Sequence, residues 1–121
     1  MKPQSRKAKG RELQKHVARV IREVLDLPDE DVVSRPMGSA GEDIMLSEKA
    51  RRKLPCDIEC KNTKSFPSLA ALQQAKDRGS DLLPMAVWKP FGKGMEESIV
   101  YFNLRDFLTL WREITNEDTS T

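Results

Sequence analysis

The segment Cys56–Lys61 limits the possible folds more than any other part of the chain, because apolar and charged side chains alternate along it without interruption. A period of two is the side-chain period of a β-strand, so every second residue would face a core. The expected core face comprises Cys56, Ile58 and Cys60, and the opposite face comprises Asp57, Glu59 and Lys61. We therefore expect a strand that presents three charged groups on one side.

The surrounding sequence predicts further helices and strands. An amphipathic helix is expected over residues 11–26, where apolar residues recur at helical spacing until Pro28 ends the pattern. Its inward face would comprise Leu13, Val17, Val20, Ile21, Val24 and Leu25, and its other face Glu12, His16, Arg19 and Glu23. Further strands are expected over 31–36, 42–46, 84–89 and 98–103, further helices over 68–78 and 105–114, and a short turn or helix over 47–54. The order αβββαββα predicts an α/β fold with a mixed central β-sheet flanked by helices.

Two details of these elements can be checked directly. In the 68–78 helix, Ser68 would cap the first turn, Leu69 and Leu72 would face inward, and Gly79 would end the helix. Trp88 and Trp111 lie in apolar segments, so we expect both in the core, with a dimer interface as the less favoured alternative.

Length and charge limit the organisation of the chain. With 121 residues, of which 38% are hydrophobic, it can bury one core but not two. We expect a single domain over residues 10–121, preceded by a flexible basic arm over residues 1–9 that has no apolar anchor. The formal net charge is only +2, yet Lys and Arg crowd the first 22 residues, where Glu12 is the single acid. This patch predicts either a solubilising tail or a surface for an acidic polymer such as DNA.

The cysteines and the hydropathy indicate an intracellular, cytoplasmic protein. In an extended segment the α-carbons of Cys56 and Cys60 would stand about 13 Å apart, which is too far for a disulfide, so we expect both to be reduced. The chain has no run of the roughly 20 apolar residues that a membrane span needs, and its basic start is not followed by an apolar stretch. No membrane association is therefore expected.

Asp43 and Glu59 are candidate metal ligands, because they would come from neighbouring predicted strands. Two carboxylates about 4 Å apart repel by roughly 4 kcal/mol at an effective dielectric near 20, so such a pair favours a bound cation. A divalent cation held by oxygen ligands offsets phosphate charge and activates water, as phosphodiester cleavage requires. Lys61, on the same face as Glu59, would orient or deprotonate that water or hold the phosphate. The alternative is a solvated strand face with an ordinary Glu59–Lys61 ion pair.

These residues resemble a known signature. The segments Gly41-Glu42-Asp43-Ile44 and Ile58-Glu59-Cys60-Lys61 look like the motif of the PD-(D/E)XK nucleases, although Glu42 stands where the signature has proline. Within that superfamily, Lys9-Gly10-Arg11-Glu12, the turn from Ser34 to Ser39 and the Gln74-Ala75-Lys76 helix are similar to Holliday junction resolvases of archaeal and phage type. The resemblance covers residues 10–103. It implies a restriction-endonuclease-like core, and it is compatible with a phage-encoded protein that acts in DNA recombination and repair.

The resemblance also implies roles for particular residues. Asp43, Glu59 and the backbone carbonyl of Cys60 would bind Mg²⁺, with Mn²⁺ as a potential substitute. Lys61 would serve the attacking water, and Glu12 would support the metal site as a fourth catalytic residue, although a helix-surface ion pair is the alternative for Glu12. The expected enzyme is a homodimer that nicks two strands of a DNA junction symmetrically.

The expected DNA contacts come from three places. The residues are Arg6, Lys7, Lys9 and Arg11 in the basic run, Arg35 and Ser39 in the glycine-rich turn, and Gln74 and Lys76 on the later helix. Gln73 adjoins Gln74, and we favour Gln74 because it directly precedes Ala75-Lys76. Two rival functions stay open: a nuclease of the same class that acts on flaps, ends or a specific duplex, and a non-catalytic DNA-binding subunit of the same fold.

Overall fold

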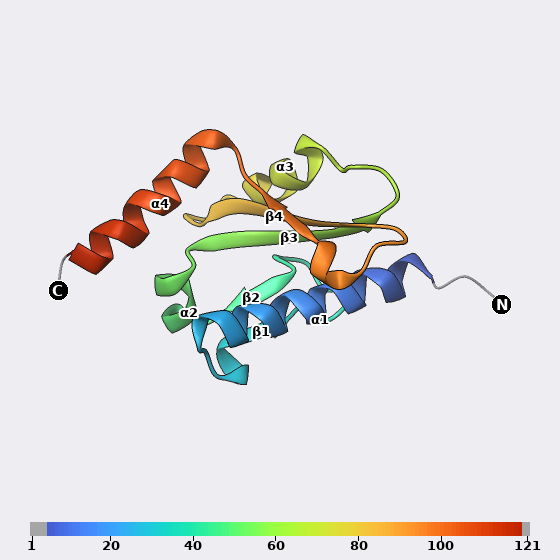
Figure 1. Cartoon of the computed structure of the whole chain (residues 1–121), viewed down its shortest axis with the longest axis horizontal. Coiled ribbons are helices and arrows are strands. Elements are labelled where there is room, and N and C mark those ends of the chain that lie inside the picture. The colour runs from blue at the N-terminus through green and yellow to red at the C-terminus, as the bar shows by residue number, and fades with distance from the viewer. Residues whose placement is uncertain (1–4, 120–121) are drawn as a thin grey trace.

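The strand β3 (Cys56–Thr63) runs through the middle of the molecule, and helices lie on both sides of it (Figure 1). The computed structural model describes residues 5–119, with side chains as far as Asn116. The helices are α1 (Arg6–Leu25), α2 (Glu48–Lys53), α3 (Leu69–Asp77) and α4 (Leu104–Thr119). The other strands are β1 (Val32–Ser34), β2 (Ile44–Leu46), β4 (Leu83–Pro90) and β5 (Ile99–Tyr101), and two 3-10 turns are η1 (Asp29–Asp31) and η2 (Met95–Glu97). The predicted α/β class is confirmed.

The strands form two sheets. In the larger one, β3 pairs in parallel with β4, and β4 pairs antiparallel with β5, so the predicted mixed sheet is present with three strands. The smaller sheet is the antiparallel hairpin of β1 and β2. A hydrogen bond of 3.1 Å from the Asp43 N–H to the Ile58 carbonyl joins the start of this hairpin to β3. The hairpin therefore lies at the edge of β3 that β4 leaves open.

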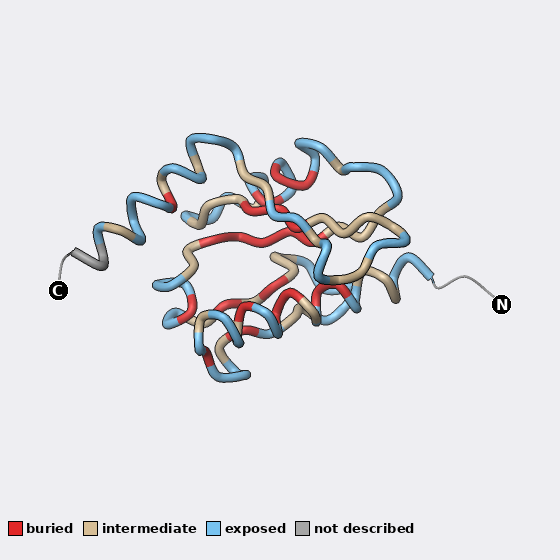
Figure 2. Tube along the Cα trace, in the orientation of Figure 1, coloured by how far each residue is buried: buried red, intermediate tan, exposed pale blue. Residues whose placement is uncertain are grey.

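The two faces of the larger sheet pack against different helices. α1 packs on β1 and β3, and it shares the main core with the side chains of Cys56, Ile58 and Cys60. On the opposite face, α3 packs on β3 and β4 and forms a smaller cluster in which Leu72 meets Ala86. β3 is buried from Cys56 to Cys60 (Figure 2), so both of its faces are covered in that stretch. The charged face predicted for this strand consequently points toward the α3 side.

The first helix begins earlier than expected. Ser5 caps it, with its Oγ accepting a hydrogen bond of 3.1 Å from the Ala8 N–H, and helix runs from Arg6 onward. Arginine and lysine are good helix formers, so a cap at Ser5 suffices to extend the helix through basic residues 6–9. The prediction of a flexible arm is therefore wrong for residues 6–9, whereas residues 1–4 lie outside the described part of the chain.

Helical spacing assigned some side chains to the wrong face. Val20 and Val24 were expected inward but are 38% and 74% exposed, while Gln14 and Ala18 are buried in their place. Leu69 is 67% exposed instead of facing inward. Spacing identifies which residues share a face, but the width of the buried stripe depends on the elements that cover it, which are distant in sequence. The Ser68 cap is also wrong, since that residue has φ +57° and its side chain makes no capping bond.

The C-terminal helix projects from the rest of the molecule (Figure 1) and carries an exposed tryptophan. Trp111 is 60% exposed, so its predicted place in the core is wrong. Trp88 is half-buried, and its Nε1–H donates to the Thr63 carbonyl at 3.2 Å, which holds the ends of β3 and β4 together. None of the helices in the described residues is long and apolar enough to cross a membrane.

Candidate active site

Asp43 lies at the junction between β2 and β3, where three hydrogen bonds fix it. Its N–H donates to Ile58, its carbonyl accepts from the Arg35 N–H at 2.8 Å, and its Oδ2 accepts from the Cys60 N–H at 2.7 Å. In a regular strand the N–H and C=O of one residue point to the same edge, so the Cys60 carbonyl points to the edge of β3 at which Asp43 lies. The hairpin thus positions a carboxylate beside the backbone of β3.

Glu59 stands on the charged face of β3 and is held by two cations. Its Oε1 lies 2.9 Å from Nη2 of Arg78, and its Oε2 lies 3.3 Å from Nζ of Lys61. Only 9% of the Glu59 side chain is exposed, against 27% of the Lys61 side chain. The ammonium group is therefore the part of this pair that solvent and a substrate can reach.

Asp57, the first residue of the charged face of β3, is buried. It is 1% exposed, and the Arg78 guanidinium donates to both of its carboxylate oxygens, with Nε at 3.1 Å from Oδ1 and 3.0 Å from Oδ2. A buried carboxylate needs such a charged, hydrogen-bonded partner. This pair raises the pKa of Arg78 further above its ordinary range, chiefly through the hydrogen bonds to Asp57.

The electrostatic environment of Asp43 differs from that of an ordinary surface aspartate. Burial raises its pKa from 3.8 to about 6 and outweighs the Cys60 N–H, which favours the ionised form. The Glu59 carboxylate contributes to this rise in pKa, while Lys61 and Arg78 oppose it. Asp43, Glu59 and Lys61 are therefore brought together closely enough to interact, as the sequence pattern predicted.

The donor set at this junction suits a hard divalent cation. Asp43, Glu59 and the Cys60 carbonyl are all oxygen ligands of the kind Mg²⁺ prefers, and the raised pKa of Asp43 reflects a site where added positive charge would be stabilising. Glu59 would have to share its oxygens with Lys61 and Arg78. Among the described residues, no three His, Cys, Asp or Glu side chains form a group that could hold a metal ion by themselves.

Glu12 lies on α1, near the end of β3. It is exposed on α1 and lines a hollow of about 380 Å³ together with Lys9, Asn62 and Lys89. Asp43 lines another hollow, on the side of the glycine-rich turn. The structure therefore brings together Asp43, Glu59 and Lys61 but places Glu12 beside the end of β3.

The glycine-rich turn holds two of the expected DNA-binding residues near Asp43. Arg35 and Ser39 line the same hollow as Asp43. The Arg35 Nε donates to the Glu42 carbonyl at 2.6 Å, and Ser39 Oγ donates to the Pro36 carbonyl at 2.9 Å. Gly41 has φ +128°, and a Cβ there would lie 2.6 Å from the Arg35 guanidinium carbon, so glycine is needed for this packing.

The other expected DNA contacts lie on two helices. Arg6, Lys7 and Arg11 are exposed on α1, and Lys9 is half-buried. Both Gln73 and Gln74 are exposed on α3, as is Lys76, so burial does not distinguish the two glutamines. Gln73 donates to Asp77 at 2.7 Å on the helix surface, an interaction that favours Gln74 as the residue available to a ligand.

Sequence reasoning missed four groups near the site. Arg78 was read only as the last residue of a helix, although the charged face of β3 has two carboxylates and only one lysine, and that charge imbalance was the available signal. Lys64, Lys89 and Lys93 were not selected because they are scattered over 30 residues of sequence, and only the fold gathers them around Asn62 and Phe91.

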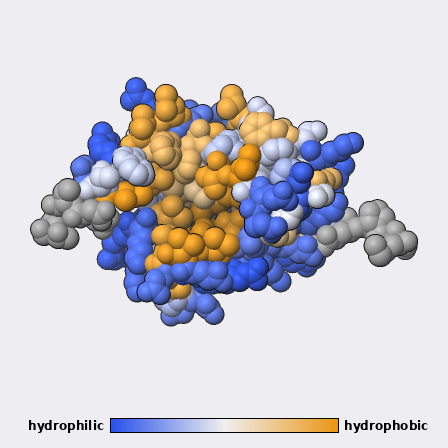
Figure 3. Space-filling view, viewed as in Figure 1, coloured by the Kyte–Doolittle hydropathy of each residue, from blue (hydrophilic) through white to orange (hydrophobic). Residues whose placement is uncertain are grey.

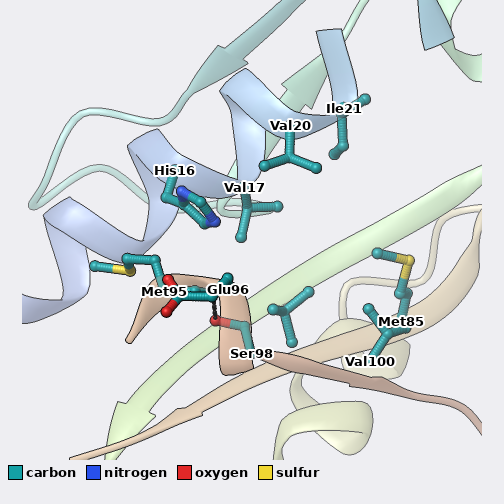
Figure 4. Close-up of a pocket in the computed structure, with 10 residues that line it drawn as sticks. His16, Val17, Val20, Ile21, Met85, Met95, Glu96, Ser98 and Val100 are labelled. Carbon is teal, nitrogen blue, oxygen red and sulfur yellow. Dashed lines mark hydrogen bonds between the residues drawn. The ribbon is translucent and has the colours of Figure 1, made fainter. Parts of the chain in front are cut away.

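An apolar hollow opens on the α1 side of the sheet, away from the charged face of β3. It has a volume of about 370 Å³ and lies between α1 and the β4–β5 strands, with Val17, Ile21, Met85 and Val100 among its walls (Figure 4). His16 at its rim accepts, through Nδ1, a 3.2 Å hydrogen bond from the Arg19 guanidinium. This hollow lacks the paired carboxylates of the Asp43 site and belongs with the apolar surface of the molecule.

No family model matches this chain, and no curated protein or solved structure matches it either.

Proposed function

We propose that the protein is a metal-dependent DNA endonuclease of the PD-(D/E)XK class with a restriction-endonuclease-like core, and that it cleaves branched DNA as Holliday junction resolvases do. One observation carries the proposal: the hydrogen bond from the Cys60 N–H to Asp43 Oδ2, at 2.7 Å, fixes a carboxylate beside the strand that bears Glu59 and Lys61. The resemblance of the two sequence segments to the nuclease signature supplies the reaction class. DNA is the proposed partner.

The proposed roles follow from the positions of the side chains. Asp43, Glu59 and the Cys60 carbonyl would hold Mg²⁺ or Mn²⁺, which when bound offsets phosphate charge and lowers the pKa of a coordinated water. Lys61 would hold that water or the reacting phosphate, because its ammonium is the exposed member of the pair with Glu59. Arg78 would keep Glu59 in place through its contact of 2.9 Å.

The remaining parts of the proposal concern the substrate and the assembly. Three groups of side chains would contact the DNA backbone. They are Arg35 and Ser39 next to Asp43; Arg6, Lys7, Lys9 and Arg11 on α1; and Gln74 and Lys76 on α3. Glu12 would act from the neighbouring hollow. A homodimer would present two such sites, and symmetric nicking of a junction depends on their spacing.

A second candidate is a non-catalytic DNA-binding subunit of the same fold. Both carboxylate oxygens of Glu59 already have cationic partners, Arg78 and Lys61. A protein that binds DNA without cleaving it would keep such a neutralised face permanently. This observation makes turnover, rather than DNA binding, the deciding property.

The decisive experiment measures cleavage of a labelled four-way junction beside a matched linear duplex, with Mg²⁺ or with chelator. Three variants alter the site: Asp43→Asn keeps the acceptor for Cys60, Glu59→Gln keeps the shape, and Lys61→Ala removes the ammonium. Asp29→Asn and Glu48→Gln are the matched controls, because their side chains are 98% and 89% exposed outside the site. We expect the site variants to lose at least a hundredfold in cleavage rate, roughly the cost of removing a metal ligand or a charged catalytic group. Asp43→Asn and Glu59→Gln should retain DNA binding, because they leave the cationic surface unchanged.

Each other result has a distinct meaning. Equal cleavage of junction and duplex would retain the nuclease and reject the junction specificity, leaving flaps, ends or a specific duplex as substrates. Binding without any metal-dependent cleavage in the wild type would favour the non-catalytic subunit. Loss of cleavage in the two exposed control variants would show that the assay reports folding rather than the site.

A further inference from the structure

Two adjoining hollows lie where β3 and β4 end, and their walls are unusually basic. Each has a volume of about 380 Å³, and they share Asn62 and Phe91. We call them together the basic basin. Its cationic residues are Arg6, Lys9, Lys61, Lys64, Lys89 and Lys93, and Glu12 is the one acidic side chain among the residues that line it.

Three segments that are far apart in sequence build the basin. The Asn62 Nδ2 donates to the Lys9 carbonyl at 3.1 Å, which ties the first turns of α1 to the end of β3. The Lys9 ammonium lies 3.8 Å from the centre of the Phe91 ring, which ties the same helix to the loop after β4. Cation–π contact and hydrogen bonding therefore hold the three segments in one arrangement before any ligand arrives.

Lys89 on β4 and Lys93 in the following loop are also held in position. Lys89 pairs with Asn62 in the parallel register, and its Nζ donates to the Pro90 carbonyl at 3.2 Å. Gly92 has φ +78°, a conformation that glycine adopts without cost, and it turns the loop back so that Lys93 faces the same hollow as Lys89. The positive charges thus project from a structured rim rather than from a free tail.

The basin is continuous with the candidate active site, because Cys60 and Lys61 line it as well. A group of six cations with one acid attracts a polyanion, and a linear one matches a basin that extends from Lys61 along the strand ends. We propose that the basic basin binds the phosphodiester backbone of the DNA strand that enters the Asp43–Glu59 site, with Lys64, Lys89 and Lys93 as the backbone contacts. This inference rests on the proposed function for the identity of the polymer.

The test is equilibrium binding of a fluorescein-labelled duplex and a four-way junction, measured by anisotropy in chelator over a series of salt concentrations. The basin variant is Lys89→Ala with Lys93→Ala. The control variant is Lys49→Ala with Arg51→Ala, which removes the same charge from exposed positions on α2. Thermal unfolding of both variants establishes that they are folded.

We expect the basin variant to lose about tenfold in affinity for each lost phosphate contact near 0.1 M salt, and its slope of log affinity against log salt to fall by roughly 2. The control should lose little affinity and keep the wild-type slope. Equal losses in the two variants would overturn the basin, since net charge alone would then explain binding. Because binding is measured in chelator, this test does not depend on the proposed reaction. The basin can bind DNA in a protein that never cleaves it. If the wild type cleaves DNA but the basin variant binds it with unchanged affinity, the basin alone is rejected.

Discussion

Asp43 shows how one side chain can be held by the backbone and still be unfavourable to ionise. The Cys60 N–H stabilises its carboxylate, but burial and the neighbouring Glu59 raise its pKa to about 6. Because its pKa is raised in the folded state, the Asp43 carboxyl affects the free energy of unfolding differently below and above pH 6. The folded protein carries the cost of the ionised form at neutral pH unless a cation is present to offset it.

This cost predicts a pH-dependent stability difference in metal-free protein. Between the ordinary pKa of 3.8 and the raised value of about 6, the folded state binds more protons at Asp43 than the unfolded state, so stability is lost as the pH rises through about 6. We expect Asp43→Asn to be more stable than the wild type at pH 8 by roughly 1 kcal/mol, after allowance for solvent screening, and to match it below about pH 4. Urea unfolding in chelator at the two pH values measures the difference.

Asp29→Asn, which makes the same substitution at a side chain that is 98% exposed, is the matched control. A stability difference between Asp43→Asn and the wild type that stays constant from pH 4 to pH 8 would mean that the Asp43 carboxyl does not titrate in the folded state as proposed.

For single residues, the sequence predicted which face of a strand a side chain lies on better than it predicted how buried that side chain is. The period of two placed Asp57, Glu59 and Lys61 on one face of a strand, and the structure has them there. Burial of Asp57 could not be predicted, because its partner Arg78 is 21 residues away and reaches it only once α3 packs on the sheet. The place of Glu12 depends in the same way on how α1 crosses the end of β3.

At the scale of elements, one charged side chain, Arg78, adds an ionic link to the packing of α3 on β3. Arg78 follows the last turn of α3 and contacts both Asp57 and Glu59 on β3. The contact is nearly dry at Asp57, which is 1% exposed. A buried ion pair adds little net stability compared with an apolar pair, but removal of one member leaves the other charge buried alone.

We therefore expect Arg78→Ala to lower the free energy of unfolding by roughly 3–5 kcal/mol. Arg78→Lys should recover part of this loss, because it restores the charge but not the two-pronged contact of the guanidinium. Urea denaturation of each variant gives the values. Arg112→Ala, exposed on α4, is the matched control and should change stability by less than about 0.5 kcal/mol. If Arg78→Ala is no worse than this control, the link between α3 and β3 is not supported.

The elements themselves were largely predictable, and their boundaries were less so. Each predicted strand and helix has a counterpart, since hydrophobic periodicity and the Pro and Gly positions are local signals. The start of α1 at Arg6 and the exposed Val24 and Leu69 were not foreseen. Those features depend on a cap at Ser5 and on which neighbours cover each helix.

Over the whole molecule, apolar side chains gather on one face that spans α4, β5 and α1 (Figure 3). Leu104, Leu108 and Trp111 on α4 are 75%, 54% and 60% exposed, and Val100 on β5 is 52% exposed. The apolar hollow of Figure 4 adjoins Val100. A standard interface covers about 800 Å² on each partner, which is about a tenth of the 8017 Å² surface of this chain. This face can supply the proposed homodimer with its interface.

An apolar interface on this face predicts how substitutions on α4 change the mass of the assembly in solution. We expect Leu108→Glu with Trp111→Glu to convert a dimer into a monomer at micromolar concentration, because the two charges would be buried without partners in the interface. Sedimentation equilibrium measures the mass, and Arg105→Glu with Arg112→Glu, also on α4, is the control for added negative charge. A wild type that is monomeric at every concentration, or a variant that stays dimeric, would remove this face from the proposed assembly.

The two cysteines of β3 have a consequence for experiments on this protein. Cys56 and Cys60 are buried free thiols, as predicted, and burial raises the pKa of the Cys56 thiol to about 12. Alkylating reagents react with the exposed thiolate, so neither cysteine can be labelled until the centre of the molecule opens. At low reagent concentration the rate of labelling therefore reports the fraction of molecules in which the strand that carries Glu59 is open. A divalent cation that binds at Asp43 would slow the labelling of the cysteines, whether or not the protein cleaves a phosphodiester bond.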